Sequence, residues 1–287
     1  MKKKQIIYII GTGRSGTTLL EILIGNGEGI FSCGELNRYP RRRGIPPQQE
    51  PSSPVMQFWQ DIGKDLQLDI ATMEKQEDCH YRFEYHTGLV KKLVSAGSMR
   101  GLTEYRSFLQ KLYERIFSRI QETIITDSSK YPGRALHLSE CLSDRYDISY
   151  IYIKRDPVQV VRSFAKKDIE QPSKPFLPAN LYYFSINLLC TLVVRKLKKR
   201  HRVAEVRYED LVNNPVTLLG QIEADLGLDL KKAIKKIEAK QPLSIGCLFD
   251  GNRIRLQGNL QLRTGSKNHK MNIKDNVTRV LNYCFYR

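Results

Sequence analysis

The chain has 287 residues, with 47 Lys plus Arg against 30 Asp plus Glu, and a formal net charge of +17. Hydrophobic residues at 41% and charged residues at 27% are ordinary globular values, which argues against disordered and fibrous classes. The excess positive charge favours an anionic partner: nucleic acid, acidic lipid, a polyanion, or a phosphorylated or sulfated small molecule.

The sequence shows no sign of export or of a membrane span. Leu181 to Val194 is the longest mostly apolar stretch, and it is too short to span a bilayer. The basic and then apolar start, Met1 to Ile10, has no small-residue cleavage pattern. Six scattered cysteines without a Cys-x-x-Cys pair favour a reducing compartment over a disulfide framework or a thiolate zinc site. We therefore expect a cytoplasmic protein without a membrane span.

Short apolar segments alternate with longer helical ones along the chain. The predicted strands are Gln5–Ile10, Gly29–Ser32, Thr123–Thr126, Ile148–Lys154 and Val203–Arg207. The predicted helices are Thr17–Ile24, Thr103–Ile120, Arg134–Cys141, Pro157–Lys167, Asn180–Arg200 and Pro215–Leu226. This alternation predicts an α/β fold, in which helices flank a central parallel sheet, within a single domain over residues 1–287.

Two regions depart from that alternation. Residues 38–54 hold five prolines and the run Arg41-Arg42-Arg43, which predicts an irregular, mobile loop. Residues 251–287 hold eight Lys or Arg and one acid, Asp275. This basic C-terminal segment suits either a solvated arm or a flap over an anionic ligand.

The first predicted strand runs into a glycine-rich loop. Gly11 is followed by Thr12-Gly13-Arg14-Ser15-Gly16-Thr17-Thr18 and then by a helix, in the Gly-x4-Gly-x-Thr frame of a phosphate-binding loop. Backbone N–H groups at such a helix start bind anions, and the helix dipole adds to the attraction. The alternative is an ordinary strand-to-helix turn. Thr17 replaces the Lys of nucleotide hydrolases, and only Asp127 comes close to a metal-binding Asp, so a less charged donor than ATP is favoured.

The fourth predicted strand ends in a second anion motif. Arg155-Asp156-Pro157 follows the strand, and the next helix carries Ser163 and Lys167. Arg155 and Ser163 could converge on one phosphate at the switch point of an open sheet. A plain strand-turn-helix with a capping Asp is the alternative.

Together these segments resemble the sulfotransferase family, whose members use 3′-phosphoadenosine 5′-phosphosulfate (PAPS). Residues 14–18 match the family's 5′-phosphosulfate loop, and Arg155 with Ser163 matches its 3′-phosphate motif. The segment Val206–Leu211 is similar to a Tyr-Glu-Asp-Leu motif, and 251–255 to the Gly-Asn-x-x-Arg of bacterial members. These matches run in family order from residue 6 to about residue 255.

The resemblance implies PAPS as donor, adenosine 3′,5′-bisphosphate (PAP) as product and no metal. It also implies that residues 38–122 are an insertion on the acceptor side. The implied donor-binding residues are Arg14, Ser15, Gly16, Thr17, Thr18, Arg155, Ser163, Lys167, Tyr208, Arg253 and Arg255.

The resemblance also suggests the catalytic residues. Glu35, after Gly34, resembles the base of Golgi-type members, and Lys130 resembles a family Lys that contacts the sulfate. Arg14 is the third expected catalytic residue. His137 is the competing base, because cytosolic animal members use a His. Leu19 replaces a Trp common in those members, and the chain resembles bacterial and Golgi-type or tyrosylprotein-like members more than cytosolic animal ones.

The sequence therefore predicts metal-independent transfer of a sulfuryl group to a hydroxyl of an acceptor, with a carbohydrate or small metabolite favoured and an anionic acceptor possible. Nucleic acid is not expected as a partner. Two other interpretations remain open: a P-loop kinase with an altered lysine, and a non-catalytic polyanion-binding protein.

Overall fold

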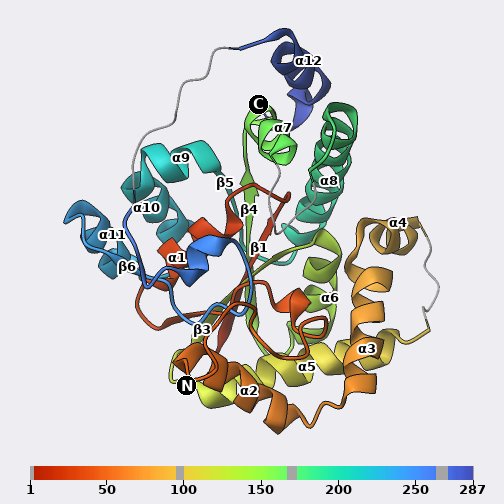
Figure 1. Cartoon of the computed structure of the whole chain (residues 1–287), viewed down its shortest axis with the longest axis vertical. Coiled ribbons are helices and arrows are strands. Elements are labelled where there is room, and N and C mark those ends of the chain that lie inside the picture. The colour runs from red at the N-terminus through yellow and green to blue at the C-terminus, as the bar shows by residue number, and fades with distance from the viewer. Residues whose placement is uncertain (1–2, 95–99, 167–172, 263–270, 287) are drawn as a thin grey trace.

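A five-stranded parallel sheet forms the centre of the molecule (Figure 1). This computed structural model describes residues 3–94, 100–166, 173–262 and 271–286. The strands are β1 (Gln5–Gly11), β2 (Ile30–Ser32), β3 (Ile124–Lys130), β4 (Asp147–Lys154) and β5 (Val203–Arg207), and their order in the sheet is β2-β3-β1-β4-β5. The predicted α/β fold is confirmed, and the predicted strands lie within two residues of the observed ones except at the end of β3.

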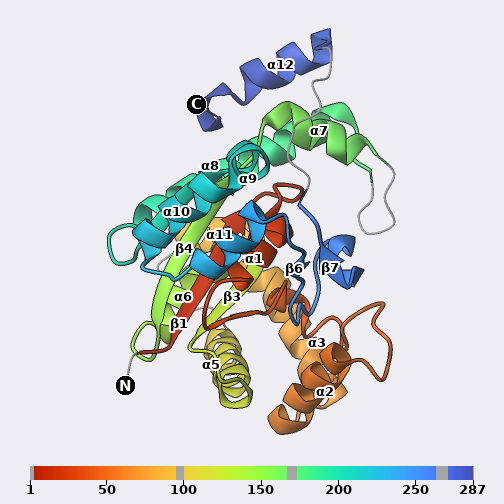
Figure 2. The ribbon, with the colours of Figure 1, turned by 90° about the vertical axis from the view of Figure 1, so that its left-hand side faces the viewer.

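Helices cover both faces of this sheet. The α-helices are α1 (Thr17–Gly25), α2 (Pro54–Leu66), α3 (Ile70–Cys79), α4 (His86–Val94), α5 (Leu102–Arg119), α6 (Pro132–Leu142), α7 (Pro157–Ala165), α8 (Phe176–Leu197), α9 (Tyr208–Asn213), α10 (Pro215–Leu226), α11 (Lys231–Glu238) and α12 (Ile273–Leu281). Alternate residues of β1 enter two different hydrophobic cores, because side chains alternate across a strand. Ile6, Tyr8 and Ile10 pack with α2, α5, α6 and α8, whereas Ile7 and Ile9 pack with α1, α10 and α11. Figures 1 and 2 show these two helical layers on either side of the sheet.

The strand β3 continues four residues beyond its predicted end at Thr126, through Asp-Ser-Ser-Lys. A polar run of this kind usually marks a loop, but here its first three residues, Asp127, Ser128 and Ser129, are buried. Asp127 accepts a hydrogen bond from Arg134 of α6 at 3.3 Å, and Arg134 also donates to Glu84 at 2.7 Å. Charge pairing inside the fold therefore extends the strand and places Lys130 at its carboxyl end.

Residues 38–54 are irregular, as predicted, but several of their side chains are held in place. Tyr39 is fully buried against Trp59 and Phe249. Arg42 Nε donates to Asp250 at 3.1 Å, and Arg43 pairs with Glu74 at 3.2 Å. These contacts fasten the loop both to α3 and to the segment just before the basic C-terminal region.

The helix α8 is shifted relative to the prediction: it begins at Phe176, four residues before the predicted start, and ends at Leu197, three residues before the predicted end. By length and composition it is the one helix among the described residues that could cross a membrane. Half of its most apolar window is buried against the rest of the protein, which is also the pattern of a core helix in a folded domain.

Candidate functional site

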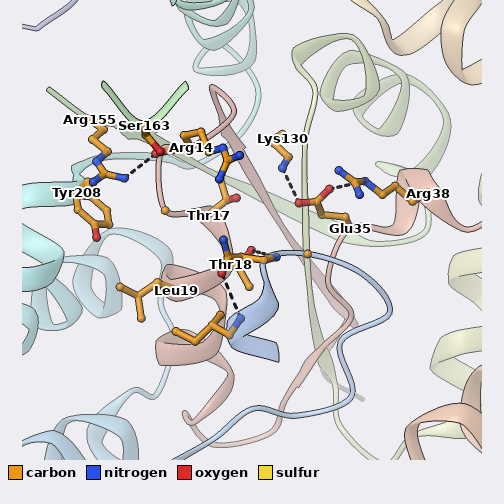
Figure 3. Close-up of a pocket in the computed structure, with 14 residues that line it drawn as sticks. Arg14, Thr17, Thr18, Leu19, Glu35, Arg38, Lys130, Arg155, Ser163 and Tyr208 are labelled. Carbon is orange, nitrogen blue, oxygen red and sulfur yellow. Dashed lines mark hydrogen bonds and ion pairs between the residues drawn. The ribbon is translucent and has the colours of Figure 1, made fainter. Parts of the chain in front are cut away.

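A cavity of about 230 Å³ opens at the carboxyl ends of β1 and β4 (Figure 3). This is the edge where open α/β sheets bind their ligands. Nine of the predicted site residues line it: Arg14, Gly16, Thr17, Thr18, Glu35, Lys130, Arg155, Ser163 and Tyr208. The glycine-rich loop with Arg14, the second anion motif, Glu35 and Lys130 therefore face one space.

The loop between β1 and α1 has the geometry of an anion cradle. No side chain caps the N-terminus of α1, so its first N–H groups point toward the cavity end of the helix. Gly16 has φ of 94°, and a Cβ there would lie 2.3 Å from Cδ2 of Tyr208. Only glycine fits this position, and the Tyr208 ring forms the wall beside it.

Ser15 was expected to bind the donor, but its side chain has a structural role. Its side chain is buried and its hydroxyl donates to the Thr12 carbonyl at 2.7 Å, within the loop. The Ser15 side chain therefore holds the loop in shape, and any contact with an anion there would come from its backbone.

Arg155 is held over the cavity by three neighbours. Its guanidinium lies 3.9 Å from the centre of the Tyr208 ring, and Nη1 donates to the Arg14 carbonyl at 2.8 Å. Gln159 accepts from the same guanidinium at 3.2 Å. Asp156 caps α7 by accepting from the Val158 N–H at 2.7 Å, so the capping role and the anion motif coexist. Lys167 lies outside the described residues.

The start of the basic C-terminal region reaches the cavity. Gly251 and Asn252 line it, and the Asn252 N–H donates to the Thr18 hydroxyl at 3.2 Å. Arg253 is exposed and Arg255 is buried, where it donates to the Pro47 carbonyl at 3.0 Å. Neither arginine lines the cavity, although both were expected to bind the donor.

Glu35 sits between two cations. Lys130 Nζ donates to Glu35 Oε1 at 2.5 Å, and Arg38 Nε lies 2.8 Å from Oε2 (Figure 3). The Glu35 carboxylate raises the pKa of Arg38 above its usual value. Arg38 was not among the predicted site residues, because it belongs to a basic, proline-rich run that looks like an ordinary surface loop.

The backbone on both sides of Glu35 is anchored from inside the protein. The Gly34 N–H donates to Glu21 Oε1 of α1 at 2.8 Å, and the Glu35 N–H donates to the Asp250 carbonyl at 3.0 Å. Gly34 has φ of 78°, and a Cβ there would lie 2.5 Å from that carbonyl oxygen. Burial raises the pKa of Glu21 to about 7, against the opposing effect of its hydrogen bonds.

A second, smaller cavity of about 60 Å³ adjoins the first. It shares Glu35, Arg38 and Lys130 with the larger cavity. Its remaining lining is Gly11, Gly13, His86, Tyr131, Pro132, Tyr182 and Ile186. The carboxylate of Glu35 and its two cations thus stand between a polar cavity and one lined mainly by rings and apolar side chains.

His137, the competing base, lies away from both cavities. It is fully buried in α6, against the rings of Phe83 and Tyr105. Burial lowers its pKa to about 3, and no described residue hydrogen bonds to either ring nitrogen. In this position the imidazole is neutral and lines neither cavity.

Asp127, the nearest approach to a metal-binding Asp in the sequence, also belongs to the interior. It accepts from the Ser129 N–H at 2.8 Å and is fully buried with Arg134. Among the described residues, no three His, Cys, Asp or Glu side chains are grouped so that they could hold a metal ion.

Comparison with known proteins agrees with this architecture. A sulfotransferase family model matches residues 6–232. The sulfotransferase domain of the Synechococcus PCC 7002 olefin synthase is 19% identical, with a TM-score of 0.52 over 99% of this chain and 96% of that chain. The sulfotransferase domain from the curacin biosynthetic pathway is 17% identical, with a TM-score of 0.53 over 98% of each chain.

The sulfotransferase STF9 from Mycobacterium avium is 12% identical, with a TM-score of 0.50 over 83% of this chain and 68% of that chain. No curated protein matches. At these identities the solved structures show a shared fold, and the family follows from the sequence match. Because that match covers most of the chain, the protein belongs to the sulfotransferase family, a family of PAPS-using transferases.

Proposed function

We propose that this protein transfers the sulfuryl group of PAPS to a hydroxyl of an acceptor, in line and without a metal. The observation that carries the proposal is the position of Glu35, which lines both the larger cavity and its smaller neighbour. A base in that place can reach a hydroxyl in one cavity that faces a donor in the other.

The lining of the larger cavity fits a donor with separate anionic groups. The uncapped start of α1 with Thr17 and Thr18 would hold the 5′ end, where the sulfuryl group is. Arg155 and Ser163 would hold the 3′-phosphate, since a guanidinium makes paired, charge-assisted hydrogen bonds with phosphate. Gly16 leaves room for the backbone to approach an anion beside the Tyr208 ring.

When bound, PAPS supplies the sulfuryl group, and its bond to the bridging phosphate oxygen breaks as the acceptor oxygen attacks sulfur. Glu35 would take the hydroxyl proton of the acceptor. Lys130 and Arg14 would stabilise the negative charge that forms on the bridging oxygen. In the ligand-free arrangement Lys130 pairs with Glu35. Binding of the anionic donor would draw the Lys130 ammonium group toward the donor and free the Glu35 carboxylate.

The smaller cavity is our candidate for the acceptor site. At about 60 Å³ it is smaller than the roughly 150 Å³ cavity that holds one benzene, so it would take only the hydroxyl-bearing end of a carbohydrate or small metabolite. Tyr131 and Tyr182 offer ring faces there, and Arg38 offers a cation for an anionic acceptor. We also propose a cytoplasmic location; all six cysteines are free thiols in the structure, which supports it.

Mass spectrometry can test this function directly. The protein is incubated with PAPS and a panel of sugars, phenols and small alcohols, and each acceptor is examined for the mass of one added sulfuryl group. Release of PAP without a sulfated acceptor would show hydrolysis rather than transfer. No product from any acceptor, together with phosphorylation of an acceptor by Mg-ATP, would support the kinase interpretation instead.

A further inference from the structure

The polarity of α12 is the reverse of that of an ordinary surface helix. Its buried face is polar: Asp275 accepts from Arg162 Nε of α7 at 3.0 Å, and Asn282, just after the helix, donates to Asn180 of α8 at 3.0 Å. Its outer face is apolar and consists of Ile273, Val277, Val280 and Leu281. Ile273 is 82% exposed and Val280 is 77% exposed. The hydrophobic effect does not favour this arrangement in water.

The adjoining helix α8 exposes an apolar stripe of its own. Residues three or four positions apart share one face of a helix, and this face of α8 carries Leu177, Leu181, Phe184, Leu188 and Leu192. Leu181 is 65% exposed. The rings of Phe184 and Phe285, the latter just beyond α12, lie 5.0 Å apart and join the two faces. Figures 1 and 2 show α12 beside α7 and the start of α8, at one end of the molecule.

Positive charge predominates around this surface, although Asp156, just before α7, lies 3.8 Å from Arg279. Residues 173–204 contain Lys and Arg but no Asp or Glu, and the only acid after residue 270 is Asp275, which is paired with Arg162. The stripe of α8 ends at exposed Arg195 and Lys196, and α12 carries exposed Lys274 and Arg279. Two copies of the chain would bring like charges together here, so a second copy is a poor match for the surface.

We propose that the outer faces of α8 and α12 form a docking surface for an anionic lipid bilayer. Apolar side chains flanked by cations are the combination that binds at the membrane interface, with the apolar groups among the headgroups and the cations on acidic lipids. The protein lies on the bilayer and does not cross it, because the opposite face of α8 packs in the core. The same helix supplies Tyr182 and Ile186 to the smaller cavity, so the surface is close to the proposed acceptor site.

Vesicle flotation tests the proposal with the full chain. The probes are vesicles of phosphatidylcholine alone and vesicles of phosphatidylcholine mixed with an equal amount of phosphatidylglycerol. We expect flotation with the anionic vesicles, little with the neutral ones, and a decrease when salt is raised. The double variant Leu181→Gln and Val280→Gln should reduce flotation by about tenfold or more.

The matched control is Ile70→Gln with Val94→Gln, which removes equally exposed apolar side chains, 70% and 84% exposed, from other helices. It should float like the wild type. Retained stabilisation by PAP shows that a variant is folded, and the single variant Ile273→Gln replaces the double variant if that one is unstable. Equal flotation of the test and control variants would overturn the proposal. A wild-type protein that does not float with anionic vesicles would also overturn it. That includes a protein that light scattering shows to be a dimer, with twice the 33.2 kDa mass of one chain.

Discussion

Lys130 Nζ lies 2.5 Å from Oε1 of Glu35, and Lys130 has a φ of 64° in the left-handed region that residues with side chains rarely adopt. This strained backbone conformation at the end of β3 directs the Lys130 ammonium group toward the cavity. Such strain persists only where the surroundings fix it, and here the buried charges of Asp127 and Arg134 hold the preceding residues. The ion pair at the centre of the site therefore depends on the interior of the fold.

The choice of donor can be tested by thermal stability. We expect PAP to raise the melting temperature and Mg-ATP to do little, because the cavity offers separate sites for two anionic groups and has Thr17 in place of the Walker lysine. A ligand that binds only the native state stabilises it by about 2.7 kcal/mol at a hundredfold excess over Kd. A larger shift with Mg-ATP than with PAP would contradict the assignment of the donor.

Arg155 should dominate binding of the 3′-phosphate. Arg155→Ala should weaken the affinity for PAP by roughly 2–4 kcal/mol, as expected for loss of a desolvated charge partner. Ser163→Ala should cost about 1 kcal/mol. Calorimetric titration with PAP measures both, and Arg145→Ala, at an exposed arginine that pairs with Glu114, is the control. An unchanged affinity in Arg155→Ala would remove this motif from the donor site.

Glu35→Gln should separate turnover from donor binding. The amide keeps the size of the side chain and some of its hydrogen bonds but cannot accept the acceptor proton, so turnover should fall by ~10²-fold or more while PAP affinity changes little. His137→Ala, assayed in parallel, should keep its turnover wherever the fold survives. The assignment of the base fails if Glu35→Gln turns over normally and folded His137→Ala is inactive.

Glu21 should make stability depend on pH. Its pKa is about 7 in the folded protein, against an unperturbed value of 4.5, so the folded state binds the proton more tightly than the unfolded state. The unfolding free energy therefore decreases by about 3 kcal/mol as pH rises from 4.5 to 7, and the contribution of Glu21 is constant above pH 7.

Glu21→Gln can accept the same hydrogen bonds from Gly34 and Thr126 without a charge. Its melting temperature, measured relative to the wild type, should therefore increase between about pH 5 and pH 8. Glu50→Gln, at an exposed carboxylate, should show no such trend. A constant difference between Glu21→Gln and the wild type across this range would contradict the predicted titration.

Local sequence patterns predicted the sheet, the glycine-rich loop and the motif at Arg155, because apolar runs and glycine spacing act over a few residues. The patterns missed what depends on distant partners. Arg38 becomes a site residue only because Glu35 and Asp250 lie next to it, and β3 continues through polar residues only because Arg134 neutralises Asp127. Arg255 is the opposite case: it was expected at the site, but its side chain is buried next to Pro47 and does not line the cavity.

Asp250 connects two regions that are far apart in the sequence. Its buried carboxylate pairs with Arg38 and Arg42, and its backbone carbonyl accepts from the Glu35 N–H. The family match ends at residue 232, well before this residue. A shortened chain that stopped at that boundary would keep the whole parallel sheet, yet it would lose Gly251 and Asn252 from the donor cavity and the anchor of the proposed base. It would also lose Phe249, which packs on Tyr39 and Trp59, and most of α11, so expression of the matched segment alone should give a less stable protein with a defective active site.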